Sequence, residues 1–226
     1  MWYIIKADPG AHLYAGFNQE ITPYEYQKRV EDGTITEVLA DHQVKAGDVF
    51  YLPAGRVHAI CGGILLAEVQ QSSDVTYRIF DYNRPGMDGK PRELHTELAA
   101  QALDYHVEEN YRTEYIDTNN SAVQIIDSPY FDVRVMEINR PMHRNLIKYD
   151  SFIITMCLQG DCIIKVRSTG EEVVLKEGYS ALIPSVLADY DVFPASATSK
   201  ILDAFIDNMD RSFSHQVTRF LHITQQ

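Results

Sequence analysis

Two stretches of the chain follow the same pattern of turns and strands. VKAGDVFYLPAGRVHA at 44–59 aligns at a constant offset with LKEGYSALIPSVLADY at 175–190. In both, an apolar residue and a lysine precede a glycine, and a proline stands six residues after that glycine. Glycine and proline at fixed positions mark the turns that bound a short strand. The pattern predicts two modules built to one plan, with His58 opposite Asp189.

Most other apolar residues lie in short runs of the kind that form strands. In the first half we predict strands at 2–6, 13–17, 48–52, 64–69 and 75–82. From residue 122 onward eight more runs follow, separated by turn sequences such as QGD, STGE and KEG. Many short strands with frequent turns are typical of a β-sandwich or barrel. The chain is therefore predicted to be mainly β.

Two segments carry helical signals instead. In TPYEYQKRVEDG, Thr22 is the predicted N-cap and Glu25 completes a capping box, before Gly33 ends the helix. In ELHTELAAQALDYH, at 93–106, three leucines lie near one helical face. We expect this second helix to close the first module, so the modules are predicted at 1–110 and 111–226.

The charge of the chain argues against polyanionic partners. The formal net charge is −12, and lysine and arginine form no run anywhere in the sequence. Such a chain repels nucleic acid and anionic membranes, so we expect neither as a partner. A small anionic substrate would need a local cluster of basic side chains.

Cysteine content and hydropathy point to a reducing compartment. The three cysteines, Cys61, Cys157 and Cys162, are odd in number and form no C-x-x-C pair. This argues against a disulfide framework and against a cysteine zinc knuckle. The sequence contains no apolar run of membrane-spanning length and no secretory leader pattern. We therefore expect a cytoplasmic protein.

A histidine follows the turn of the first repeat. The pattern G-D-x-x-Y-x-P-x-G-x-x-H at 47–58 resembles the second conserved motif of the cupin superfamily, whose fold is a jelly roll or double-stranded β-helix. In that fold His58 would begin a return strand and face the cavity, where a metal ion can bind. The alternative is a core histidine that is hydrogen-bonded to a neighbour. The turn residues around it favour the ligand.

A polar segment follows about twenty residues later. LAEVQQSSDVTYRIFDYNR, at 66–84, is too polar for a buried strand unless it lines a site. With strict alternation, Arg78 and Phe80 share one face of the strand. An arginine on the inner face of a barrel needs a carboxylate or an anionic ligand as its partner.

Three segments resemble one enzyme family. MWYII, LPAGRVHAICGGILLAEVQQSSDVTYRIFDYNR and GKPRELH together resemble type I mannose-6-phosphate isomerases of the short bacterial form, across essentially the whole chain. The resemblance implies two cupin modules and the zinc-dependent interconversion of mannose 6-phosphate and fructose 6-phosphate through a cis-enediol. By motif position, His58 would be a zinc ligand and Arg78 the catalytic arginine.

The chain also departs from the family pattern. The family's other zinc ligands, a Q-x-H-P motif and a glutamate before the Trp-Tyr strand, are not in this sequence. We therefore expect a first module incomplete at its N-terminus, weak zinc binding and impaired activity, as in a fragment. Unpaired strand edges would favour a homodimer. Glu93, His95 and Glu97 are expected on a solvated helix face far from the motif.

Several alternatives stay open. Arg84, Lys90 and Arg92 could contact the substrate phosphate or be ordinary surface charges. The second module is expected to be metal-free, because it has Asp189 where the first has His58. The chain could instead be a non-catalytic bicupin module that binds a sugar or sugar phosphate. A sensor domain of a regulator is less favoured, since we find no helix-turn-helix pattern.

Overall fold

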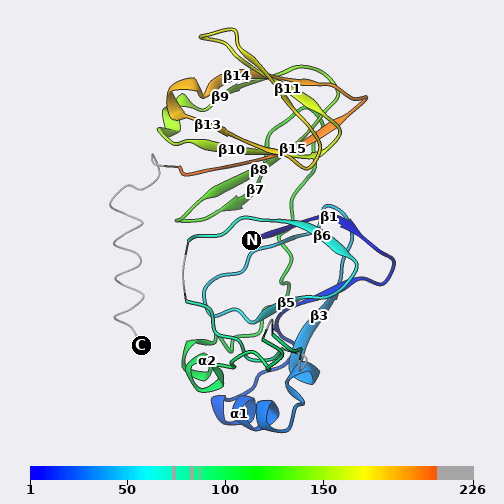
Figure 1. Ribbon diagram of the computed structural model, residues 1–226, viewed down its shortest axis with the longest axis vertical. Helices are drawn as coiled ribbons and strands as arrows, with labels where there is room; N and C mark the ends of the chain where they lie inside the picture. Colours follow the sequence, from blue (N-terminus) through cyan, green and yellow to red (C-terminus); the bar gives the residue numbers. More distant parts are fainter. Residues whose placement is uncertain (73–74, 82–83, 87, 208–226) are drawn as a thin grey trace. The chain divides into compact units, whose positions relative to one another are not determined.

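The chain forms two compact units. The computed structural model describes residues 1–72, 75–81, 84–86 and 88–207. The first unit is Met1–Thr113 and the second begins at Glu114, close to the predicted boundary after residue 110. Each unit contains two antiparallel sheets (Figure 1), so the prediction of a mainly β fold with two modules is confirmed.

The first unit has two three-stranded sheets. One has the order β4-β1-β6 and the other β3-β2-β5. Their bounds are β1 Trp2–Ala7, β2 His12–Phe17, β3 Leu39–Gln43, β4 Val49–Phe50, β5 His58–Ile60 and β6 Ile64–Glu68. Inward side chains of both sheets, among them Trp2, Leu13 and Phe50, form one buried cluster. Helix α1 (Pro23–Glu31), helix α2 (Thr96–Ala102) and the 3-10 turn η1 (Ile35–Val38) complete the unit.

The second unit has larger sheets of the same kind. Their orders are β13-β10-β15-β8-β7 and β12-β11-β14-β9. The bounds are β7 Val123–Asp127, β8 Asp132–Ile138, β9 Met142–Asn145, β10 Ile153–Gln159, β11 Cys162–Val166, β12 Glu172–Leu175, β13 Ser180–Ile183, β14 Asp189–Pro194 and β15 Ser199–Phe205. The 3-10 turns are η2 Ile147–Tyr149 and η3 Ser185–Leu187. The two sheets enclose a hydrophobic core between them.

The two units repeat one strand arrangement. The order β4-β1-β6 corresponds to β13-β10-β15, and β3-β2-β5 corresponds to β12-β11-β14. The first residues of the repeated strands also correspond, because β5 begins at His58 and β14 at Asp189. The shared plan predicted from the sequence repeat is therefore confirmed.

The second unit pairs strands at two edges that stay open in the first. There β8 pairs with β15 and β9 pairs with β14. The corresponding edges, on β6 and β5, pair with no further strand among the described residues. Leu65 on β6 and Ile60 on β5 remain 53% and 44% exposed. The homodimer that would cover such edges stays a prediction.

The helices agree with the sequence only in part. The predicted capping box of α1 is present, with Glu25 N–H donating to Thr22 Oγ1 and Thr22 N–H to Glu25 Oε2. Helix α2 begins only at Thr96, so Glu93 precedes it. The predicted strand at 75–82 is wrong, since its described residues, 75–81, form no strand. None of the described helices is long and apolar enough to cross a membrane.

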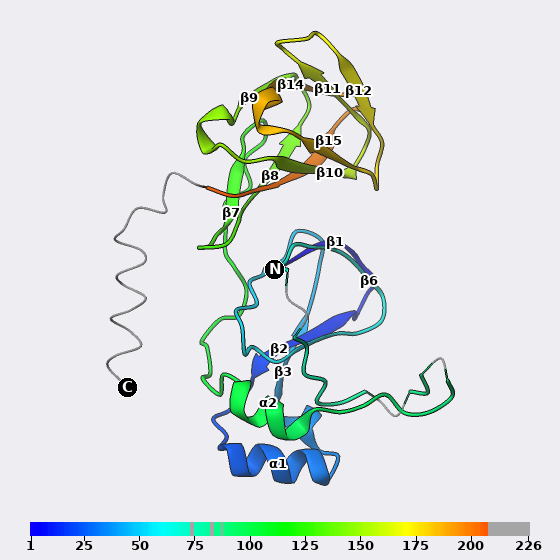
Figure 2. The ribbon, with the colours of Figure 1, turned by 60° about the vertical axis from the view of Figure 1, so that its left-hand side comes forward.

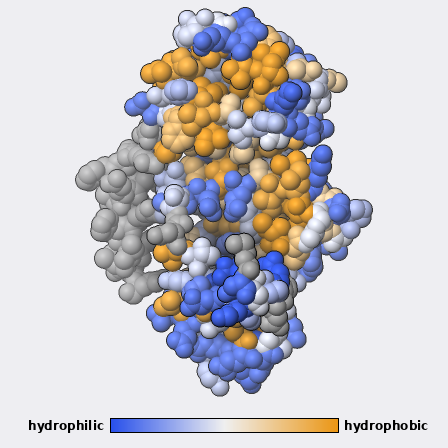
Figure 3. Space-filling model, viewed as in Figure 1, coloured by the Kyte–Doolittle hydropathy of each residue, from blue (hydrophilic) through white to orange (hydrophobic). Residues whose placement is uncertain are grey.

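Several large apolar side chains of the second unit are exposed. On β12 and β13 and in the segments beside them these are Val173, Val174, Tyr179, Leu182 and Val186. Figure 3 shows hydrophobic colour over part of this unit's surface. The cysteines Cys61, Cys157 and Cys162 are unbridged thiols, as expected, and the latter two are buried.

A buried ionic network joins the two sheets of the second unit. The Asp203 carboxylate, on β15, is fully buried. Arg144 Nη2 on β9 donates to its Oδ2 at 3.1 Å, and the Tyr190 hydroxyl on β14 donates to the same oxygen at 3.3 Å. Thr155 Oγ1 on β10 donates to Oδ1 at 2.8 Å. Burial is the main reason why the pKa of Tyr190 lies far above its ordinary value.

Removing one charge of the Asp203–Arg144 ion pair should destabilise the protein more than removing both charges. Asp203→Leu leaves Arg144 buried without its carboxylate, which should lower the free energy of unfolding by about 3–5 kcal/mol. The double variant Asp203→Leu/Arg144→Met should recover much of that loss. Denaturant unfolding of the three proteins measures both values. A double variant less stable than the single one would contradict this account.

Candidate functional site

The turn before His58 requires glycine at one position. Gly55 has a φ of +85°, and a Cβ atom there would lie 2.7 Å from the carbonyl oxygen of Ala102. Its own carbonyl accepts the N–H of Asp104 at 2.9 Å. A side chain at 55 is therefore excluded by both conformation and space. The turn is held against the end of α2, and β5 starts from this fixed point.

The His58 side chain has a defined orientation and tautomer. Its Nδ1 lies 2.7 Å from the carbonyl oxygen of Arg56, and only a protonated Nδ1 can bond to that acceptor. In the neutral ring Nε2 is then the unprotonated nitrogen, the form that binds metal ions. The ring also meets Trp2 edge-on, with centroids 5.2 Å apart.

The carbonyl that orients His58 belongs to a well-anchored residue. The Arg56 side chain is buried and donates to Glu108 Oε1 at 3.0 Å. Its guanidinium lies over the ring of Tyr111, 4.9 Å from the centroid. The segment after α2, which carries Glu108 and Tyr111, thus holds Arg56 and with it the turn before His58.

Glu68 occupies the position that Asp203 takes in the second unit. On β1 and β6 Trp2 pairs with Glu68, as Thr155 pairs with Asp203 on β10 and β15. The indole Nε1 of Trp2 donates to Glu68 Oε1 at 3.1 Å, and the glutamate is exposed. The sequence placed Glu68 in the polar segment expected to line a site but gave it no role of its own, because its relation to Asp203 depends on strand register.

The residues present do not form a zinc site by themselves. In the described part of the chain, no group of three or more histidine, cysteine, aspartate or glutamate side chains could hold a metal ion. A catalytic zinc site usually has three protein ligands and a water. His58 supplies one donor of the required kind, and its role as a ligand stays a prediction.

Arg78 is held by residues that were expected to lie elsewhere. Its N–H donates to His95 Nδ1 at 3.2 Å, and His95 N–H donates to its carbonyl at 2.8 Å. Its Nη1 donates to the carbonyl of Glu93 at 3.2 Å. The prediction that Glu93 and His95 lie on a solvated helix face is wrong, because α2 begins after them and both contact Arg78.

Arg78 and His58 adjoin one hydrophobic cluster. This cluster of the first unit contains Val57, next to His58, and packs against Ile79, next to Arg78. The two predicted site residues therefore extend from segments that share a core. Their roles as ligand and catalytic residue stay predictions.

The predicted phosphate contacts lie on one projecting segment. The described part of 78–95 is drawn in green in Figure 2 and projects from the first unit. Arg84 Nη2 donates to Asp81 Oδ1 at 2.8 Å, and Arg92 Nε donates to Asp81 Oδ2 at 2.6 Å. Lys90 is exposed, and its carbonyl accepts the N–H of Gly86 at 2.6 Å. The structure thus brings Arg84 and Arg92 together on one carboxylate.

Asp81 acts as a clamp for this segment. Only 6% of the residue is exposed. Hydrogen bonds from Arg92 and then Arg84 hold its pKa well below the ordinary range. A lowered pKa means that the clamp's contribution is complete above about pH 4 and is lost as the pH falls below that value.

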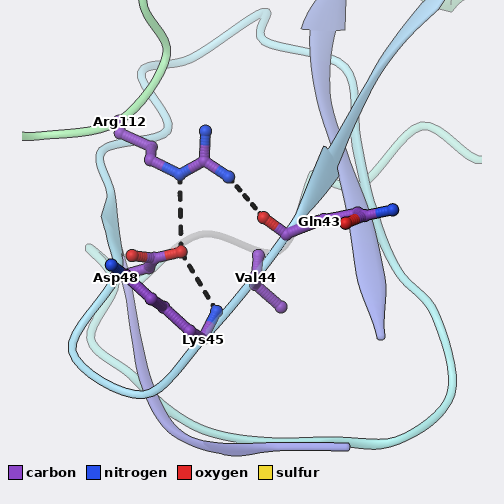
Figure 4. A pocket seen from close by; sticks show the side chains of 5 residues that line it. All are labelled: Gln43, Val44, Lys45, Asp48 and Arg112. Carbon is purple, nitrogen blue, oxygen red and sulfur yellow. Dashed lines mark hydrogen bonds and ion pairs between the residues drawn. The ribbon is translucent and has the colours of Figure 1, made fainter. Parts of the chain in front are cut away.

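A shallow pocket of the first unit contains none of the predicted site residues. Its volume is about 480 Å³, and Figure 4 shows the side chains that line it, which are Gln43, Val44, Lys45, Asp48 and Arg112. Arg112 Nε donates to Asp48 Oδ2 at 3.4 Å, and its Nη2 donates to the carbonyl of Gln43. The Arg112 guanidinium is therefore already bonded to Asp48 and Gln43, which also line the pocket.

Neutralising the clamp should open the projecting segment. Asp81→Asn removes the charge that holds Arg84 and Arg92, so amide hydrogen exchange in 78–95 should speed up at pH 7. In the wild type, the amide protection of 78–95 should be the same at pH 7 and pH 5, after correction for intrinsic exchange. Asp88→Asn is the matched control, because it keeps the acceptor for the Lys90 N–H. Equal exchange in both variants would rule the clamp out.

Comparison with known proteins gives the relatives of this fold. No family model matches the chain. It is 32% identical to the mannose-6-phosphate isomerase ManA of Bacillus subtilis over 192 residues, which are 84% of this chain and 59% of that protein. The mannose-6-phosphate isomerase of Streptococcus mutans is 30% identical over 190 residues, which are 84% of this chain and 58% of that protein. The chain thus spans about three fifths of these relatives.

The solved structures agree with the sequence comparison. The crystal structure of a mannose 6-phosphate isomerase from Bacillus subtilis superposes with a TM-score of 0.78 at 28% identity, over 90% of this chain and 63% of that one. A putative mannosephosphate isomerase from Archaeoglobus fulgidus shares the fold, with a TM-score of 0.66 at 19% identity, over 90% of this chain and 59% of that one. The resemblance to mannose-6-phosphate isomerases is therefore confirmed, in sequence and in fold, over the part of their length that this chain spans.

Proposed function

We propose that the chain is part of a zinc-dependent mannose-6-phosphate isomerase, which interconverts mannose 6-phosphate and fructose 6-phosphate through a cis-enediol. The observation that carries the proposal is the state of His58 at the start of β5. Its Nδ1 is bonded to the Arg56 carbonyl and its Nε2 is left for a ligand. Arg78 and Glu68 supply the further polar groups of the site.

The reaction needs charge stabilisation and proton transfer. A proton leaves C2 of the aldose while the C1 carbonyl oxygen gains one, and this gives the cis-enediol. A proton then enters at C1 while the C2 hydroxyl gives up its proton and becomes the ketone carbonyl. The Arg78 guanidinium would stabilise the negative charge that develops on the enediolate oxygens. The exposed carboxylate of Glu68 is a candidate carrier of the proton.

The zinc site would be completed at the open edge of β5. In the second unit β9 pairs with β14 so that Asn145 lies opposite Asp189. A strand added to β5 in the same way would place a residue directly opposite His58. We propose that this strand supplies the other ligands, and that the chain alone has impaired activity for want of them.

The projecting segment supports a phosphate contact. Asp81 is shared between Arg84 and Arg92, so this cluster keeps a net positive charge. Lys90 adds an exposed ammonium group to the same segment. We propose that these three side chains meet the phosphate of the substrate, against the overall negative charge of the chain.

One observation favours a second candidate function. The described residues contain no three-ligand metal group, and the polar side chains of the first unit could hold a sugar by hydrogen bonds alone. A non-catalytic bicupin module that binds a sugar or sugar phosphate is therefore the alternative.

Metal content and turnover of the purified chain decide between these functions. We expect much less than one zinc per chain and weak turnover of mannose 6-phosphate in a coupled assay. His58→Ala should abolish the remaining zinc, while His106→Ala, at an exposed histidine of the same unit, should not change it. One zinc per chain with full turnover would contradict the impaired state. Binding of mannose 6-phosphate without any turnover would support the alternative.

Replacement of Arg78 should affect turnover more than binding. Arg78→Ala removes the group that stabilises the enediolate, so kcat should fall by roughly a hundredfold or more, with a much smaller change in KM. Steady-state kinetics of the wild-type and variant chains, at an enzyme concentration high enough to follow the weak turnover, gives both constants. Arg167→Ala removes a surface arginine of the second unit that pairs with Asp191, and it should leave both constants unchanged. A rise in KM at constant kcat would assign Arg78 to ground-state binding instead.

A further inference from the structure

Both polar groups of the Arg78 peptide are bonded to one residue. The Arg78 N–H donates to the ring Nδ1 of His95 at 3.2 Å, and the Arg78 carbonyl accepts the His95 N–H at 2.8 Å. The second bond needs only a backbone N–H, and any residue except proline at 95 could make it. The first bond needs an acceptor in the side chain at 95.

The same segment holds the Arg78 side chain. Arg78 Nη1 donates to the carbonyl of Glu93 at 3.2 Å, two residues before His95. The backbone and the guanidinium of Arg78 are therefore fixed by one short stretch of chain. A small movement of that stretch would redirect the guanidinium.

His95 is itself fixed by its surroundings. Its carbonyl accepts the N–H of Ala99 at 2.9 Å, so it forms the N-terminal end of α2. Ala99 is buried in the core cluster of the first unit. The ring lies beside that of Tyr77, with centroids 6.1 Å apart. The backbone of His95 is thus tied to a helix packed in the core, and its ring lies against Tyr77.

We propose that His95 is a positioning residue for Arg78, which aims the guanidinium at the enediolate of the sugar phosphate. The assignment rests on the proposed isomerase function. The ring accepts at Nδ1, so the neutral side chain carries its proton on Nε2. His95 would act on catalysis through Arg78.

Two variants separate the ring's acceptor from its bulk. Asn Oδ1 can replace Nδ1 as the acceptor, so His95→Asn should keep the Arg78 N–H bond, whereas His95→Leu removes it. Hydrogen exchange of the Arg78 amide and the NMR signal of its Nε–H report its order on the full chain without any turnover. We expect order in the wild type and in His95→Asn, and its loss in His95→Leu. His106→Leu, at an exposed histidine, is the control.

The kinetic readout distinguishes positioning from general destabilisation. His95→Leu should lower kcat on the order of ten- to a hundredfold with KM within about threefold, because a misplaced group affects the transition state more than binding. His95→Asn should lose clearly less kcat than His95→Leu. Equal losses in the two variants would overturn the proposal.

The tautomer of His95 provides a test that needs no variant. Long-range ¹H–¹⁵N spectra of the wild-type chain should show the proton on Nε2, and a proton on Nδ1 would overturn the proposal even if His95→Leu failed to fold. Binding of mannose 6-phosphate by the wild-type chain without any turnover would count against the proposed function and for the non-catalytic alternative. The order of Arg78 in the three proteins would still decide whether His95 positions it.

Discussion

The interior of the second unit depends on one buried carboxylate. Asp203 receives hydrogen bonds from three strands, and these strands come from both of its sheets. A buried charge is tolerated only when its hydrogen-bond partners are present. The register of the strands brings Arg144, Thr155 and Tyr190 to Asp203, and their bonds to Asp203 in turn stabilise that register. This interior is filled by the protein's own groups.

The first unit uses the same position differently. Glu68 stands where Asp203 does, but it is exposed and receives the Trp2 indole instead of a threonine hydroxyl. The strand that carries Arg144 in the second unit has no described counterpart in the first. A carboxylate that is structural in one unit is therefore accessible to a ligand in the other.

Local features of the fold could be predicted from the sequence, and features that depend on pairing could not. The capping box at Thr22 and the common plan of the repeats rest on neighbouring residues, and both are present. The segment at 75–82 reads as a strand by its alternation, yet Arg78 bonds to His95 and Asp81 to Arg84 and Arg92. The late start of α2 and the site position of Glu68 likewise depend on contacts between distant residues.

The segment after α2 sets the minimum length of the first module. Gly16, with a φ of +80°, leaves room for Tyr111, since a Cβ atom there would lie 2.1 Å from its ring. The Tyr111 hydroxyl donates to the carbonyl of Phe17 at 2.8 Å, and Thr113 N–H donates to the carbonyl of Val49. An engineer who wished to transplant this module would have to carry it through residue 113, because Tyr111 packs under Arg56, whose carbonyl orients His58, and Thr113 bonds to β4.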